Sequence, residues 1–344
     1  MTASPSDLPN AGIPAAGVSG SGASKAGIPK ADISKAELRN GEKVVPGSSG
    51  NSGSSGNGKP VAEKPAAAVV EPSARPSRAG RDLAAAISVG VALGVIILVS
   101  LLFYRFAFVA VLAATTAVGT WELAGALRRG AGITVPLPVL LIGGQAMVWL
   151  AWPFGLTGPA AAFAATAVAV LLWRMRSGSE NYVRDVTAGM FIAAYVPLFC
   201  SFATLLTVAD DGIGRVLTFL GCVVASDIGG YAAGVLAGRH PMAPTISPKK
   251  SWEGFAGSQI AGMAAGALSV VFLLGGQWWA GLLTGALLVV SATLGDLVES
   301  MVKRDIGIKD MGTLLPGHGG LLDRIDSLLP TAVVAWAALS IVVP

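Results

Sequence analysis

The sequence predicts an all-α protein: a polytopic membrane bundle of about nine transmembrane helices, preceded by a disordered N-terminal tail. Of its 344 residues, 53% are hydrophobic and 13% are charged, and the mean hydropathy is +0.66, which excludes a water-soluble fold of this length. From Ala84 onward, apolar segments long enough to cross about 30 Å of hydrocarbon recur with short interruptions. Because backbone groups in lipid must be paired within the chain, these segments are expected to be helices rather than strands of an open sheet.

Residues 1–81 are predicted to form a disordered cytoplasmic tail. They contain 10 of the 24 Lys and Arg residues, Ser-Gly repeats at Gly47–Gly58 and few apolar side chains, so they cannot bury enough apolar surface to offset the entropy of ordering. The first apolar stretch begins too late for a cleaved signal peptide. The tail is interpreted as a solvated extension, and docking of its scattered lysines to a partner or a membrane surface is the alternative.

Residues 82–344 form the predicted membrane domain. Its nine candidate spans lie near 84–103, 106–127, 132–152, 155–173, 187–208, 216–238, 255–274, 278–298 and 327–343. The last span is short, so counts of eight or ten are the alternatives. Gly and Ala within the spans favour close helix packing, and Cys200 and Cys222 are expected to be buried free thiols because they lie inside apolar stretches.

The positions of the basic residues predict the orientation. If the tail is cytoplasmic, only Arg105 and Arg215 fall in outer loops. The inner loops then contain twelve basic residues: Arg128, Arg129, Arg174, Arg176, Arg184, Arg239, Lys249, Lys250, Lys303, Arg304, Lys309 and Arg324. This bias follows the positive-inside rule, and it supports nine spans because removing one would scramble the alternation. The sequence therefore predicts a multi-pass protein of the cell membrane with its N-terminus in the cytoplasm and its C-terminus outside.

The inner loop at 239–254 carries two adjacent lysines, Lys249 and Lys250, between Ser247 and Ser251. A Lys pair at a cytoplasmic membrane edge is a common topology anchor. Phosphate binding by the Lys pair together with Ser247 or Ser251 is the alternative interpretation.

The inner loop at Glu299–Asp326 is denser in charge, with five carboxylates, four Lys or Arg residues and His318 among five glycines. Asp can coordinate a divalent metal, Lys and Arg can neutralise phosphate oxygens, and Gly lets backbone N–H groups approach them. This composition predicts a metal and phosphate site, and salt-bridged loop packing is the alternative.

Two carboxylates lie within predicted spans. Asp227 is near the middle of the sixth span, and Asp296 is near the inner end of the eighth. Burying a carboxylate in hydrocarbon costs at least about 2.5 kcal/mol, so each is expected to be functional or ion-paired. Asp296 is the better metal candidate, because its helix continues directly into the charged loop.

The segment Ser300–Asp326 resembles the signature of the phosphatidate cytidylyltransferase (CDP-diacylglycerol synthase) family. That signature is Ser-x-x-Lys-Arg, four residues, Lys-Asp, and then His-Gly-Gly-x-x-Asp-Arg-x-Asp, and all eleven fixed positions are present. Two further segments agree with the family: Ser226-Asp227 followed by Tyr231 and Gly234, and Ile246–Gly254. The resemblance is most secure over residues 216–344, which would form the catalytic portion, and it does not include the tail.

The resemblance implies a Mg²⁺-dependent membrane enzyme of phospholipid biosynthesis that converts CTP and phosphatidic acid to CDP-diacylglycerol and pyrophosphate. It places metal ligands at Asp296 and Asp323 and implies a homodimer. It does not determine whether a second metal ion binds. We expect CTP, phosphatidic acid and the lipid bilayer as partners, and no nucleic acid.

The remaining site residues are assigned roles by their chemistry. Cations expected to neutralise the triphosphate are Lys303, Arg304, Lys309 and Arg324. Residues expected to bind the nucleotide or the lipid headgroup are Ser247, Lys249, Lys250, Ser251, Asp227, Gly319 and Gly320. Asp310 and Asp326 are expected to orient the cations and metal ligands. His318 is expected to donate a hydrogen bond or organise the loop, and a general-base role is the alternative.

Three other functions are the alternatives. In a transporter or channel, nine spans and an intramembrane Asp would be ordinary, but polar residues would concentrate near the midplane rather than at the inner edge. A CTP-using polyprenol kinase and a CDP-alcohol phosphotransferase are nearer alternatives. The latter needs an Asp-Gly-x-x-Ala-Arg box, which the segment at Asp211–Arg215 does not supply.

Overall fold

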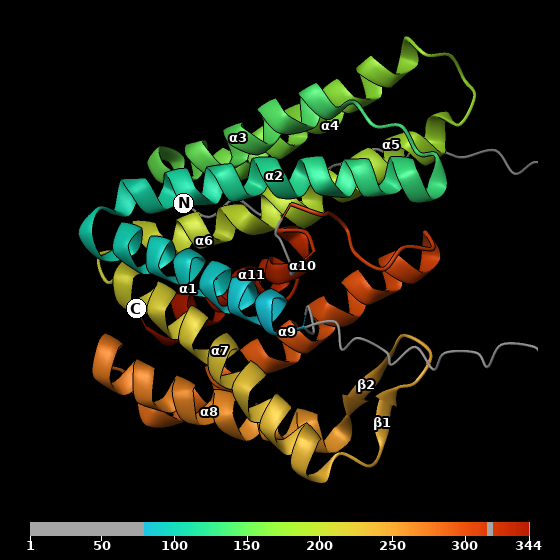
Figure 1. The fold of residues 1–344 in the computed structure, drawn as a ribbon. Helices are drawn as coiled ribbons and strands as arrows, with labels where there is room; N and C mark the ends of the chain where they lie inside the picture. Colours follow the sequence, from blue (N-terminus) through green and yellow to red (C-terminus); the bar gives the residue numbers. More distant parts are fainter. Residues whose placement is uncertain (1–78, 315–318, 344) are drawn as a thin grey trace, which may run out of the picture. The chain divides into compact units, whose positions relative to one another are not determined.

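The computed structural model describes residues 79–314 and 319–343. The predicted tail at 1–81 falls almost entirely outside these residues, and so does His318. Within the described part, helices dominate, as the composition predicts. Figure 1 shows them as a bundle, with a small β-hairpin between the C-terminal end of α7 and the N-terminal end of α8.

A helix occurs at each of the nine predicted spans. They are α1 (Ala79–Phe103), α2 (Arg105–Ala131), α3 (Leu137–Phe154), α4 (Thr157–Met175), α5 (Tyr182–Ala193) continued by the π-turn η1 (Ala194–Leu198) and α6 (Phe199–Val208), α7 (Gly212–Ala237), α8 (Trp252–Leu274), α9 (Trp278–Asp305), and the short α10 (Leu322–Ile325) leading into α11 (Leu328–Val342). Among the described residues, eight helices are long and apolar enough to cross a membrane, and the apolar part of α1, Gly90–Phe103, is shorter. Cys200 and Cys222 are free and buried, as predicted.

The charged loop before the last span is shorter than predicted. Helix α9 continues to Asp305, so Glu299, Lys303 and Arg304 are helical rather than in a loop. An i,i+4 ion pair between Lys303 and Glu299 supports this last part of the helix, and Lys303 and Arg304 lie where the helix dipole favours positive charge. The short α10 then begins at Leu322, which places Asp323 and Arg324 of the motif on a helix as well.

A β-hairpin that the sequence analysis missed joins α7 to α8. Strand β1 (Pro241–Ala243) pairs antiparallel with β2 (Ser247–Ser251). At the end of β2, Ser251 caps α8, because its Oγ accepts a hydrogen bond from the Gly254 N–H at 3.1 Å. The hairpin therefore fixes Lys249 and Lys250 next to the first turn of α8.

Glycines bring α8 and α9 into direct backbone contact. A Cβ added at Gly266 would overlap the carbonyl oxygen of Gly281, and one added at Gly285 would overlap that of Gly262. Small residues spaced by four along both helices allow this approach, as in other membrane helix pairs. The close contact places α9, and the charged residues in its C-terminal part, beside α8 and the hairpin.

Three described residues of the segment between α9 and α11 pack into a hydrophobic core. Met311 is 1% exposed and Leu322 is fully buried, and both pack in a cluster with residues of α2, α3 and α5 to α6. Ile306 joins the same cluster. Packing against the N-terminal half of the bundle therefore restrains both ends of the motif segment.

The α8–α9 contact predicts the effect of enlarging one glycine. Gly285→Leu should destabilise the protein by about 1–3 kcal/mol or more, because the new side chain overlaps the backbone of Gly262. Thermal unfolding in detergent measures this loss. Gly221→Leu in α7 is the control, since a Cβ there meets nothing within 4 Å. Equal melting temperatures for the two variants would contradict the proposed packing.

Candidate active site

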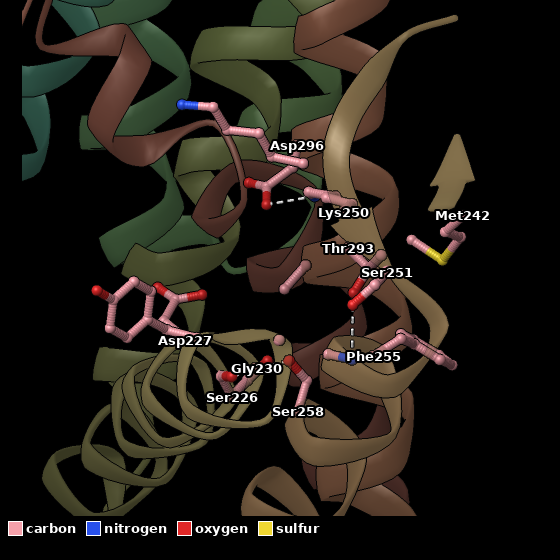
Figure 2. Close-up of a pocket in the computed structure, with 15 residues that line it drawn as sticks. Ser226, Asp227, Gly230, Met242, Lys250, Ser251, Phe255, Ser258, Thr293 and Asp296 are labelled. Carbon is pink, nitrogen blue, oxygen red and sulfur yellow. Dashed lines mark hydrogen bonds and ion pairs between the residues drawn. The ribbon is translucent and has the colours of Figure 1, made fainter. Parts of the chain in front are cut away.

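Three charged side chains on α9 form one face in its C-terminal part. Asp296, Glu299 and Lys303 are spaced by three and four residues, which places them above one another on a helix. Asp296 accepts a hydrogen bond from Lys250 Nζ at 2.6 Å, and the dashed line in Figure 2 marks this pair. Lys303 is paired with Glu299 and also donates to Asp323 Oδ1 at 3.1 Å. Helix α9 thus connects the hairpin lysine to the second half of the motif.

A polar cavity of about 220 Å³ lies between α7, α8, α9 and the hairpin. Five of the predicted site residues line it: Asp227, Lys249, Lys250, Ser251 and Asp296. Figure 2 shows Asp227 reaching it from α7, while Asp296 approaches from α9. The structure therefore brings the two intramembrane carboxylates to one cavity together with both lysines of the hairpin, which an anchor role for the Lys pair would not require.

Asp323 fixes the geometry of the motif segment. Its carboxylate accepts the Gly320 N–H at 2.8 Å and the Met311 N–H at 3.0 Å, in addition to the Lys303 ammonium. Only 5% of its side chain is exposed. Three donors around one buried carboxylate hold the chain on both sides of the glycine-rich turn against the end of α9.

Glu122 on α2 is a site residue that the sequence analysis missed. It is 2% exposed and accepts the N–H groups of Leu321 at 3.0 Å and Leu322 at 2.8 Å. A Cβ at Gly312 or Gly320 would overlap its carboxylate, so glycine is required where the chain passes Glu122. A carboxylate inside the otherwise apolar span at 106–127 was the available signal, because such a group needs a partner.

Arg129 extends this attachment along α2. It lies seven residues after Glu122, on the same face of the helix, and its Nη2 donates to the Met311 carbonyl at 2.8 Å. By sequence alone, Arg129 indicates only the topology. We refer to Glu122 and Arg129 together as the α2 clamp, because they bind the two ends of the segment 311–322.

The other predicted site residues lie around this centre. Arg304 donates to the Ile246 carbonyl at 3.5 Å, so it contacts the hairpin turn. Asp326 Oδ1 accepts the Ser327 N–H at 2.7 Å, next to Gly295 of α9. Lys309, Asp310 and Arg324 are exposed. Gly319 has a left-handed φ of 81°. Ser247 pairs with Ala243 in the hairpin.

The donor set was tested for its fit to Mg²⁺. Within 79–314 and 319–343, no three His, Cys, Asp or Glu side chains are grouped so as to hold a metal ion. Mg²⁺, however, is commonly bound by one or two carboxylates and completed by water and substrate phosphates. Asp296 borders the polar cavity, and Glu299 Oε1 is buried and finds no N–H or O–H donor in the described part of the chain. These hard oxygen ligands fit Mg²⁺, while ligation by Asp296 and Asp323 stays a prediction.

The α2 clamp predicts a measurable loss of local order. Glu122→Gln should speed amide hydrogen exchange at Leu321 and Leu322 about tenfold or more, because a neutral amide replaces a charged acceptor of two buried N–H groups. Exchange followed by mass spectrometry measures this effect. Glu180→Gln, at an exposed carboxylate, is the matched control. Unchanged exchange in Glu122→Gln would show that the clamp does not hold the segment.

Comparison with known proteins places the chain in a family. The sequence model of the cytidylyltransferase family matches residues 84–342. A phosphatidate cytidylyltransferase of Mycobacterium bovis is 49% identical over 299 residues, which cover 83% of this chain and 97% of that protein. The corresponding protein of Mycobacterium leprae is 50% identical over 280 residues, covering 77% and 89% of the two chains. The chain therefore belongs to the cytidylyltransferase family and is a nucleotidyltransferase that spans the membrane several times.

Proposed function

We propose that the chain transfers CMP from CTP to phosphatidic acid, giving CDP-diacylglycerol and pyrophosphate in phospholipid biosynthesis. The names of the mycobacterial relatives support this assignment, since they match over most of both chains. One structural observation carries it: Lys303 bridges Glu299 and Asp323, and the same face of α9 places Asp296 and Lys250 at the polar cavity. Cations that can bind phosphates, and carboxylates that can hold a metal ion, thus meet at the inner end of one helix.

In the proposed reaction, a phosphate oxygen of phosphatidic acid attacks the α-phosphorus of CTP. The bond between the α-phosphorus and the bridging oxygen breaks, and pyrophosphate leaves with the electron pair. A phosphate monoester is already anionic near neutral pH, because its second pKa is about 6, so a strong general base is not needed. Catalysis then depends on positioning the two phosphates and on neutralising their charge.

The polar cavity suits a phosphate group rather than a whole nucleotide. Its volume of about 220 Å³ is below the roughly 300–1,000 Å³ of pockets that enclose drug-sized ligands. Lys249, Lys250 and the Ser251 hydroxyl would bind phosphate oxygens there. Asp227 lies on the opposite wall and would limit how many negative charges the cavity accepts.

The motif cations would neutralise the remaining phosphates. Lys303 already lies between two carboxylates, whereas Arg304, Lys309 and Arg324 are exposed near the same end of α9. Gly319 and Gly320 would bring backbone N–H groups close to a phosphate, and Asp310 and Asp326 would orient the cations. Mg²⁺ held by Asp296 and Asp323 would supply additional positive charge to the phosphate oxygens. Glu299 would be a ligand for a second ion, if one binds.

We further propose that the protein lies in the cell membrane with its N-terminus and active site in the cytoplasm and its C-terminus outside. The distribution of Lys and Arg among the loops supports this orientation. In this orientation the site reaches cytosolic CTP and the headgroup of a lipid in the inner leaflet. A homodimer, implied by the family resemblance, is a further proposal that light scattering in detergent can test.

A direct assay tests the reaction. Purified protein in detergent, given phosphatidic acid, labelled CTP and Mg²⁺, should produce labelled CDP-diacylglycerol and pyrophosphate. Chelation by EDTA should abolish the product, and added Mg²⁺ should restore it. No product from folded protein would refute the proposed reaction, and undiminished product in EDTA would refute its metal dependence alone.

The predicted metal ligands give a second test. Asp296→Asn and Asp323→Asn should each reduce kcat about 100-fold or more, because each replaces a charged ligand at the centre where phosphate charge develops. Asp305→Asn, at the exposed end of α9, is the matched control and should remain within about twofold of wild type. Steady-state turnover at saturating CTP and Mg²⁺ measures these effects. Near-normal turnover in both site variants would remove the two residues from the catalytic centre.

A further inference from the structure

A second cavity, of about 450 Å³, lies between α1, α2, α6, α7 and the α10–α11 segment. Its walls are aliphatic and aromatic along most of their area. Of the described residues that line it, Thr115, Cys200 and Arg324 are those with polar side-chain atoms. The volume falls within the roughly 300–1,000 Å³ of ordinary ligand pockets, so the cavity is large enough for a substantial part of a lipid chain.

This apolar cavity is adjacent to the charged centre, and α10 separates the two. Asp323 on α10 contacts Lys303, whereas its neighbour Arg324 lines the apolar cavity. Leu321 and Ile325 line the cavity as well, and the Leu321 N–H is bound by Glu122. One short helix therefore carries both a carboxylate that contacts Lys303 and a guanidinium that lines the apolar cavity.

The cavity also extends to the lipid-facing surface of the bundle. Ile96 on α1 forms part of its wall and is 51% exposed. An apolar cavity of this kind excludes water, and if left empty its walls lose dispersion contacts. Within a bilayer, the apolar molecule that can fill it is an acyl chain.

We propose that this cavity holds an acyl chain of phosphatidic acid, with Arg324 binding the phosphate at its end. The inference rests on the proposed function, because it assigns the lipid substrate to that site. The charge of Arg324 distinguishes the occupant from a chain of bulk neutral lipid, since a guanidinium forms strong, directional hydrogen bonds with phosphate. An acyl chain moving from bilayer to cavity gains little hydrophobic free energy, so the cavity positions the substrate and selects chain length rather than providing most of the affinity.

Two glycines on α1 allow the cavity to be filled without disturbing its walls. Gly90 and Gly94 line it, and a Cβ at either position meets nothing within 4 Å. Gly94→Phe should lower kcat/KM for dioleoyl phosphatidic acid by about tenfold relative to dioctanoyl phosphatidic acid, because the new ring occupies the space of the distal part of the chain. Gly221→Phe in α7, also in open space but outside the cavity, should leave that ratio unchanged.

A second measurement uses unmodified protein. Phosphatidic acid carrying a photoreactive group at the chain end should label peptides of α1, α2 and α11 that line the cavity, and Gly94→Phe should reduce that labelling. An unchanged ratio of kcat/KM values, an equal loss for both chain lengths, or labelling elsewhere would overturn the proposal. Equal labelling by photoreactive phosphatidylcholine would assign the cavity to bulk lipid and overturn it too. No product from either chain length with wild-type protein would instead refute the proposed reaction.

Discussion

The site depends on a single ammonium group held between two carboxylates. Lys303 is paired with Glu299 on its own helix and with Asp323 on α10, and the exposed fractions of the three side chains are 18%, 2% and 5%. Charges this far from water are tolerated only when they are paired, and removing one partner of such a group costs about 3–5 kcal/mol. The shared ammonium therefore ties the C-terminal part of α9 to α10.

The α2 clamp gives the second constraint, and it acts on the backbone rather than on charge. Glu122 and Arg129 bind N–H and carbonyl groups of the segment 311–322, which would otherwise be buried without partners. Met311 and Leu322 then pack into the core beside α2. The described residues at both ends of this glycine-rich segment are thus held by a helix outside the motif.

The sequence was sufficient to predict the helical spans and the residues of the motif, because both are local signals. Apolar length identifies a span, and the motif from Ser300 to Asp326 is contiguous. It did not predict the partnership of Glu122 with Leu321 and Leu322, which joins positions about 200 residues apart. The hairpin at 241–251 was also missed, since Pro and Lys are poor indicators of strands and its two strands are short. The metal ligands remain predictions.

The α2 clamp has a consequence for the boundaries of the functional unit. Residues 216–344 contain every motif that resembles the family, and by sequence alone they would be taken as the catalytic domain. A fragment beginning at residue 216 would nevertheless lack the acceptor for two buried amides and most of the core around Met311. Transplanting residues 216–344 alone between relatives would therefore transfer the site residues without the α2 clamp that holds them. The N-terminal helices and the motif half form one functional unit.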